Sequence, residues 1–233
     1  MQSVSVDNMR VGASVAGTVD LYRNFTIAMR GAAAELLSGI SNGTKSLVAM
    51  DRDFKRLADD FEHMLAGQVG YSLREGSGNA LRACEEQTRS HATDRSLAVA
   101  DTLVASFTDS VVSTISAQMR ADVRTAEDFV RRQLMGGRAF ATTDQLATEL
   151  EFKFKDKSGR QIDSADHVFR EVNWSYRANF NTTLLFAASS LGIEEFEVEG
   201  GSKSGEVVSL DDYDKKSGSI FHHNSKALLR IKT

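Results

Sequence analysis

The sequence predicts an α+β protein that is mostly α, with an N-terminal long-helix region followed by a small α+β unit that contains a short antiparallel sheet. Apolar residues recur at steps of three and four over much of the N-terminal half, which is typical of amphipathic helices. Near the C-terminus the period changes to two, because Phe196 and Val198 alternate with glutamates, as in a half-buried strand. We therefore expect a helical region over residues 1–137 and a small domain over 138–233.

The composition is that of an ordinary globular protein. Hydrophobic residues make up 41% of the chain and charged residues 26%, which excludes a disordered chain, a collagen and a disulfide-stapled toxin. The formal net charge of −4 argues against a basic nucleic-acid-binding module. Cys84 is the one cysteine, which excludes an internal disulfide and a metal cage built from cysteines. The first residues do not resemble a signal peptide, and no run of about 18 apolar residues occurs, so we expect a soluble protein made in a reducing cytoplasm.

Two amphipathic helices are predicted over 18–40 and 46–66, because apolar residues recur on one face of each. Gly67 and Gly70 are expected to end the second helix, since glycine weakens a helix interior. The sequence Gly-Ser-Gly-Asn at 76–79 predicts a further break before a short helix.

The clearest predicted element is a long helix over about residues 94–135, with Asp94 as N-cap and Gly136-Gly137 as a stop. At 1.5 Å per residue, such a helix is about 60 Å long. Its apolar seam is too long for one small domain to cover, so we expect another subunit to cover it. The candidate partner-contact residues are Val104, Phe107, Val111, Ile115, Met119 and, on a later helix, Trp174.

After Gly137 the predicted elements are shorter and include strands. Residues 142–145 resemble a capping box and predict a short helix that reaches Phe154. The polar run 155–159 predicts a turn, and Ser164 is expected to cap a helix that Gly192 ends. The remaining predicted elements are a strand around 195–199, a turn over 200–205, a return strand over 207–210 and a last strand over 227–231.

Two clusters have the residue types of a metal site. His222 and His223 are adjacent, and adjacent residues on a strand point to opposite faces, so a polar turn is favoured over a shared metal. Asp211, Asp212 and Asp214 lack the glycine and the terminal glutamate of a calcium loop, so a solvated loop is favoured. We therefore predict no metal site.

Three other features carry weak catalytic signals. The run 200–205 has the glycines, lysine and serine of a phosphate loop, but it joins two predicted strands and is expected to be a hairpin turn. Glu195, Glu197 and Glu199 share one strand face, for which solvation is the favoured interpretation. Cys84 has no nucleophile signature and is expected to be a small buried hydrophobe. We predict no catalytic residue and no cofactor, and hence a protein that is not an enzyme.

Four features of the second half occur in one order. They are Gly136-Gly137-Arg138 before a short segment over 144–150, Asn181 eleven residues before Gly192-Ile193, a strand and a return strand that starts at Gly205, and the segment 221–231 with His222, His223 and Asn224. This order resembles the phage Mu protein F-like head morphogenesis family, the minor head proteins of tailed bacteriophages. The positions that match the family pattern are Asn181, Gly192, Gly205, His222, His223 and Asn224, and we assign them structural roles.

The chain departs from the family pattern at two places. An Arg-Thr-Glu triplet expected near 173–175 is replaced by Asn-Trp-Ser. The proline and both cysteines of the last motif are replaced by His223, Ser225 and Ala227. A metal or thiol role of that motif therefore does not carry over to this chain.

The resemblance implies a structural minor component of a phage head, made in the host cytoplasm and located in the virion. Such proteins associate with the portal or the capsid interior in a multi-subunit assembly, and some are linked to DNA delivery. Arg120, Arg124, Arg131 and Arg132 on the long helix could contact packaged DNA, although a solvated helix face is favoured.

Two alternatives come from other functional classes. One is a hydrolase or group-transfer enzyme, with a cleft formed by His222, His223 and the acidic segment 211–214. The other is a helical adaptor of a bacterial complex, in which the long helix pairs in a coiled coil.

Overall fold

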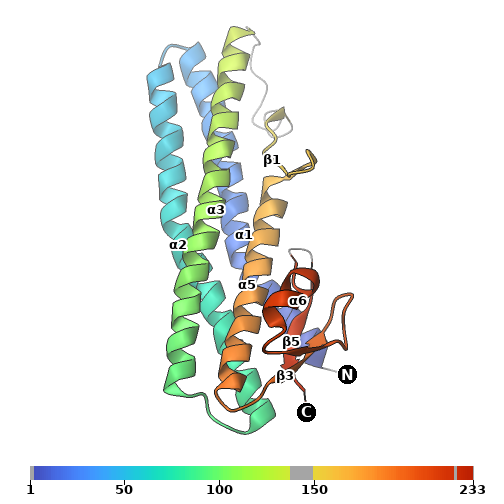
Figure 1. The fold of residues 1–233 in the computed structure, drawn as a ribbon. Coiled ribbons are helices and arrows are strands. Elements are labelled where there is room, and N and C mark those ends of the chain that lie inside the picture. The colour runs from blue at the N-terminus through green and yellow to red at the C-terminus, as the bar shows by residue number, and fades with distance from the viewer. Residues whose placement is uncertain (1–2, 137–148, 223–224, 233) are drawn as a thin grey trace. The chain divides into compact units, whose positions relative to one another are not determined.

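The computed structural model describes residues 3–136, 149–222 and 225–232, and it confirms the mostly helical α+β fold with a small antiparallel sheet (Figure 1). The elements in chain order are α1 (Ser3–Ser41), α2 (Leu47–Thr88), α3 (Asp94–Met135), β1 (Lys153–Lys155), β2 (Gln161–Asp163), α5 (Ser164–Ser189), β3 (Glu195–Glu199), β4 (Val207–Ser209), α6 (Tyr213–Ile220) and β5 (Leu228–Ile231).

The chain forms two compact units. Unit 1 comprises residues 1–18, 67–111 and 169–233, and unit 2 comprises residues 19–66 and 112–168. Helices α1, α2, α3 and α5 each contribute residues to both units. The β1–β2 hairpin belongs to unit 2, whereas the larger sheet and α6 belong to unit 1. The predicted domain boundary after residue 137 lies outside the described residues.

Helix α2 corrects the prediction that glycines end it. It runs without a break through Gly67, Gly70, Gly76 and Gly78. Each glycine costs a helix about 1 kcal/mol relative to alanine, so tertiary packing overrides the local preference here. At Gly76 the packing leaves no room for a side chain, because a Cβ atom there would lie 3.2 Å from the ring of Tyr176.

The predicted bounds of α3 are confirmed, but its N-cap is one residue earlier than predicted. The Thr93 hydroxyl accepts the backbone N–H of Ser96 at 3.1 Å, which is the contact of a capping side chain. The same correction applies to α5, where Asp163 rather than Ser164 caps the helix. Its carboxylate accepts the backbone N–H of Ala165 at 2.8 Å.

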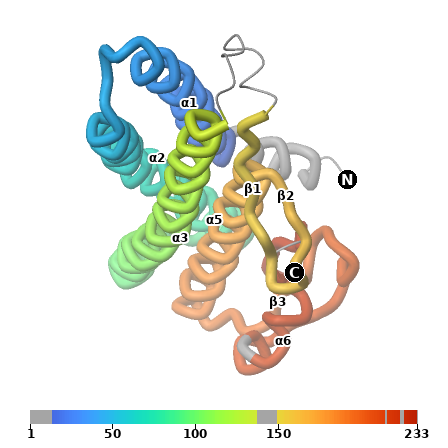
Figure 2. Tube along the Cα trace, turned by 90° about the horizontal axis from the view of Figure 1, so that it is seen from above, coloured from blue at the N-terminus to red at the C-terminus, as the bar shows by residue number. Residues whose placement is uncertain are grey.

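The prediction that a helix reaches Phe154 is wrong, because a short β-hairpin occupies this position. Phe154 lies in β1, which runs beside β2 (Figure 2). The two strands pair antiparallel, and Phe154 lies opposite Ile162. The predicted polar turn is confirmed between these strands, where the Asp156 carboxylate accepts the N–H groups of Ser158 and Arg160, both at 2.9 Å. The predicted capping box at 142–145 lies outside the described residues.

The sheet of unit 1 has the order β4-β3-β5 and is antiparallel throughout. The alternation predicted for β3 is confirmed, because Phe196 and Val198 are buried while the glutamates between them are not. Gly200 and Gly205, at φ angles of +78° and +89°, allow the chain to turn into β4. Helix α6 follows β4 and was not predicted, because its eight residues show no apolar periodicity.

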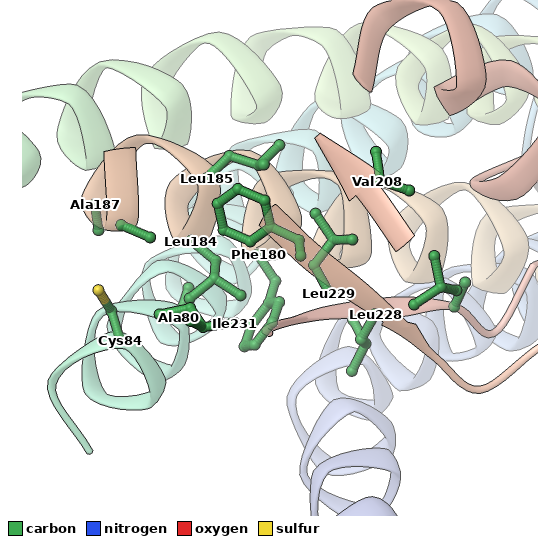
Figure 3. Packing of buried hydrophobic residues seen from close by; sticks show 14 of the residues in the cluster. Ala80, Cys84, Phe180, Leu184, Leu185, Ala187, Val208, Leu228, Leu229 and Ile231 are labelled. Carbon is green, nitrogen blue, oxygen red and sulfur yellow. The ribbon is translucent and has the colours of Figure 1, made fainter. Parts of the chain in front are cut away.

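Each unit has its own apolar core. In unit 1, Phe180, Leu184 and Leu185 on α5 pack with Leu229 and Ile231 on β5 (Figure 3). The same cluster takes in Ala80 and Cys84 from α2 and Val208 from β4.

In unit 2, three aromatic rings connect α1 with α2. Phe25 lies 5.7 Å from Tyr22 and 5.6 Å from Phe61, measured between ring centroids, and the second pair meets edge to face. Tyr22 and Phe25 are fully buried. The aromatic cluster therefore places the hydroxyl of Tyr22 inside the protein, where it needs a buried partner.

Within the described residues, α3 is the one helix whose length and composition would allow it to cross a membrane. This is weak support for a membrane span, since the core helix of a soluble protein meets the same criteria. Asp101 and Asp109 are exposed on α3, so its uncovered face is charged.

Candidate functional site

The apolar seam of α3 is covered by the chain itself. Val104, Val111, Ile115 and Met119 are all buried, and Phe107 is partly buried. The expectation that this seam needs another subunit to cover it is therefore corrected. Within unit 2, α3 is joined to α1 by the Tyr22–Asp122 hydrogen bond and to α2 by the Arg120–Glu62 ion pair. The sequence prediction had α2 ending about twenty residues too early.

The predicted contact residue Trp174 takes part in a polar row on α5. Its indole N–H donates to the backbone carbonyl of Phe221 at 3.0 Å. Arg177 donates from Nη1 to the carbonyl of Lys226 at 2.9 Å. Asn181 accepts the backbone N–H of Leu229 through Oδ1 at 2.9 Å. We call Trp174, Arg177 and Asn181 the α5 clamp, because their spacing of three and four residues puts them on one helix face.

The α5 clamp holds the C-terminal strand at its outer edge. Strand β5 pairs with β3 on one side, so the amides of Leu229 and Ile231 point away from the sheet. Asn181 satisfies the first of these amides, and the Gln87 side chain on α2 satisfies the second at 2.9 Å. Helix side chains thus cover an edge that would otherwise be open to another strand.

Arg177 is the buried cation of this clamp. Burial lowers the pKa of its guanidinium, which nevertheless stays charged at any physiological pH. Its Nε also donates to the side-chain oxygen of Asn173, at 3.3 Å. A guanidinium that donates to a backbone carbonyl fixes the position of the chain, so the geometry gives Arg177 an architectural role.

A second polar row on α5 faces α2 within unit 1. The Tyr176 hydroxyl accepts from Asn79 at 2.8 Å. Asn179 donates to the carbonyl of Leu73 at 2.8 Å and to the Ser77 hydroxyl at 2.9 Å. Buried side-chain hydrogen bonds of this kind fix the register of one helix against another.

Among the described residues, the carboxyl group with the most perturbed pKa lies in unit 2. Asp122 on α3 is 1% exposed and receives a hydrogen bond from the Tyr22 hydroxyl at 2.7 Å. Gln118 and Ser164 donate to its other oxygen at 2.8 and 3.1 Å. Among the described residues, no lysine, arginine or histidine forms an ion pair with Asp122.

Burial dominates the electrostatics of this network. Desolvation raises the pKa of Asp122 from 3.8 to about 6, against the opposing effect of the three donors. The nearby charge of Asp163 raises the pKa further. Burial and the Asp122 carboxylate together raise the pKa of Tyr22, so its phenol stays protonated and donates. Since no substrate can reach a carboxyl that is 1% exposed, we assign the network a structural role.

Sequence reasoning did not identify this network, although a signal was present. Asp122 lies three residues after Met119 and four before Ala126, so a carboxylate occupies the apolar stripe of the helix. Such a position predicts a buried charge with specific partners. The partners could not be found from sequence, because Tyr22 is 100 residues away.

Of the described metal-ligand candidates, Asp211 and Asp212 precede α6 and His222 follows it. His222 is exposed after α6, Asp211 is exposed, and Asp212 lies 3.7 Å from Lys215 at the start of that helix. In the parts of the chain that the structure describes, no group of three histidine, cysteine or acidic side chains could hold a metal ion. The family-motif positions His223 and Asn224 lie outside the described residues.

Apart from Asn181 in the α5 clamp, the remaining family-motif positions are glycines. Gly192 adopts a φ of +78° and ends the α5 region with the turn that the sequence predicts. Gly205 bonds through its N–H to the carbonyl of Val198 at 2.8 Å and closes the β3–β4 turn. Both positions shape the backbone and offer no side chain to a ligand.

The glutamate row on β3 pairs with cations of β5 and of the residue after it. Glu197 lies opposite Arg230 in the sheet and accepts from it at 2.7 Å. Glu195 accepts from Lys232 at 2.7 Å. The hydrogen bond that Arg230 donates to Glu197 raises the pKa of Arg230. The row is thus an ordinary cross-strand charge pairing, as expected for a solvated sheet face.

The arginines of α3 are interleaved with acidic side chains. Arg131 lies 3.1 Å from Asp51 and 3.7 Å from Glu127, and Arg120 lies 3.6 Å from Glu62. These pairs neutralise two of the four arginines in the patch proposed for DNA contact. A solvated, charge-balanced face is therefore the better interpretation of this surface.

Cys84 lies in the core of unit 1, as predicted. Its side chain is 2% exposed, and burial raises the pKa of its thiol. The neutral thiol is a poor nucleophile, so Cys84 acts as a packing residue.

A scan against protein-family models finds no match for this chain, and searches of the curated proteins and of the solved structures find none either. The resemblance to phage minor head proteins therefore stays a prediction from the sequence.

Proposed function

We propose that this protein is a structural minor component of a tailed-phage head that contacts the portal or the interior of the capsid. The observation that carries the proposal is the hydrogen bond between Asn181 and the backbone of Leu229. It joins two of the sequence segments on which the resemblance rests, although they are 48 residues apart. Three of the four ordered motifs therefore lie in unit 1, whereas Gly136 of the first motif lies in unit 2.

The chemistry of the α5 clamp supports the same proposal. Trp174, Arg177 and Asn181 each bond to a backbone group of the C-terminal segment. A polar row that binds its own backbone stabilises a shape, whereas a catalytic row must present its polar groups to a substrate. This arrangement favours a unit whose surface is used for docking.

The contact with other head proteins is expected away from the α3 seam, since that seam is already buried. Large apolar side chains that remain exposed include Leu47 and Val48 at the start of α2. Contiguous exposed apolar side chains mark contact surfaces more often than isolated ones do. These two residues replace the seam as candidate contact residues of unit 2.

Quantitative mass spectrometry on purified, DNA-filled particles tests the proposal. The particles must come from a phage whose genome encodes this chain. We expect the chain at a low copy number that stays constant relative to the portal protein through successive purification steps. Absence of the chain from particles, or a copy number that falls with each step, would overturn the proposal.

A further inference from the structure

A pocket of about 260 Å³ opens in unit 1 between the first turns of α3 and the last turns of α5. The segment that follows β4 completes its wall. The lining residues are Arg95, Ser96, Val99, Phe186, Ser189, Ser190 and Leu210. The proposed function uses none of these residues.

The apolar part of the pocket is incompletely covered. Phe186 is 51% exposed and Leu210 is 40% exposed, although both are large apolar side chains. Leaving such surface in water costs about 25 cal/mol per Å². A ligand with an apolar body would gain this free energy by covering both side chains.

The hydroxyl groups of Ser189 and Ser190 in the pocket already donate hydrogen bonds to backbone carbonyls. Ser189 donates to the carbonyl of Leu185 at 2.6 Å, and Ser190 donates to the carbonyl of Ala187 at 2.7 Å. Ser96 lies 3.1 Å from the Ser190 hydroxyl. These hydroxyls therefore offer lone pairs and are poor donors to an anion.

Arg95 is the one charged residue of the lining, and it is exposed. Among the described residues it has no hydrogen bond or ion pair. A free guanidinium presents paired N–H groups that match the two oxygens of a carboxylate. One cation in the lining balances one negative charge, which favours a monoanion.

The volume of the pocket limits the size of the apolar part of the ligand. A cavity of about 150 Å³ holds one benzene molecule, so about 260 Å³ accommodates about ten carbon-sized atoms. We propose that this pocket binds an apolar monocarboxylate of about eight to ten carbons. The chain of the ligand covers Phe186 and Leu210, and its carboxylate binds Arg95.

Titration of the full chain with octanoate tests this site, with 1-octanol as the neutral probe and octylammonium as the cationic probe. Binding is followed by backbone amide chemical shifts of Ser96 and Ser190. We expect octanoate to bind about tenfold more tightly than 1-octanol, as expected for a charge-assisted hydrogen bond, and octylammonium to bind most weakly. Equal affinity for octanoate and 1-octanol, or shift changes that spare both serines, would overturn the proposal.

Two variants separate the roles of charge and apolar contact. Arg95→Gln should weaken octanoate binding about tenfold and leave 1-octanol within about twofold, whereas Phe186→Ala should weaken both. The matched controls are Arg74→Gln on α2 and Phe169→Ala on α5, which are exposed and outside the lining. An Arg95→Gln protein that keeps its circular dichroism spectrum and its preference for octanoate would exclude the assigned carboxylate site.

Discussion

Raising the pH from 4 to 7.5 is expected to weaken the fold of unit 2 through one carboxyl group. Asp122 is buried without a cation among the described residues, and desolvation raises its pKa from 3.8 to about 6. The folded protein therefore binds the proton of this carboxyl more tightly than the unfolded chain does. The stability contributed by the protonated group is complete below about pH 4 and is lost as the pH rises through 6.

The magnitude follows from the two pKa values. At 1.36 kcal/mol per pKa unit, the difference between 3.8 and about 6 corresponds to a loss of about 3 kcal/mol in the free energy of unfolding. The perturbation that isolates it is Asp122→Asn, which resembles the protonated acid in shape. The asparagine oxygen can accept from Gln118 and Ser164, and its amide can donate to the oxygen of Tyr22.

The assay is urea unfolding of both proteins, followed by circular dichroism at several pH values between 4 and 7.5. The free energy of unfolding of the wild type, minus that of Asp122→Asn, should fall by about 3 kcal/mol across this range. Asp128→Asn changes an exposed carboxylate on the same helix and should leave the pH profile of the wild type unchanged. A difference between wild type and Asp122→Asn that stays constant within about 0.5 kcal/mol would refute the reasoning.

Two further outcomes concern unit 1. Gly78→Ala should stabilise the protein by about 0.5–1 kcal/mol, since a Cβ there meets open space, whereas Gly76→Ala should gain nothing, because its Cβ would lie 3.2 Å from the ring of Tyr176. Thermal unfolding of the matched pair measures this, and equal gains would contradict the packing argument. Asn181→Ala should cost about 1–3 kcal/mol and speed hydrogen exchange at the Leu229 amide, because that buried N–H loses its acceptor. Unchanged protection at this amide would show that the side chain does not hold β5.

Elements with strong local periodicity could be predicted from the sequence. The apolar steps of α3 fix both its existence and its bounds, because a 42-residue amphipathic pattern has no strand alternative. The alternation around Phe196 and Val198 identifies β3 for the same reason. The turn between β3 and β4 follows from its glycines, since only they adopt the required positive φ without strain.

Features that depend on distant contacts could not be predicted. The continuity of α2 through Gly76 depends on the ring of Tyr176, 100 residues later in the chain. The α5 clamp joins residues that are 47 to 49 positions apart, which leaves no short-range spacing to detect. The burial of Ile115 and Met119 on α3 also depends on segments that are distant in the sequence, so it could not be predicted from local spacing.

Cross-linking mass spectrometry on intact, DNA-filled particles tests most directly whether the small α+β part of unit 1 is a docking surface. Lys203 and Lys215 are exposed there and react with amine-specific reagents. The account predicts cross-links from these lysines to the portal or to a capsid protein, at sites that recur between particle preparations. Particles in which both lysines link only to residues of their own chain would contradict it.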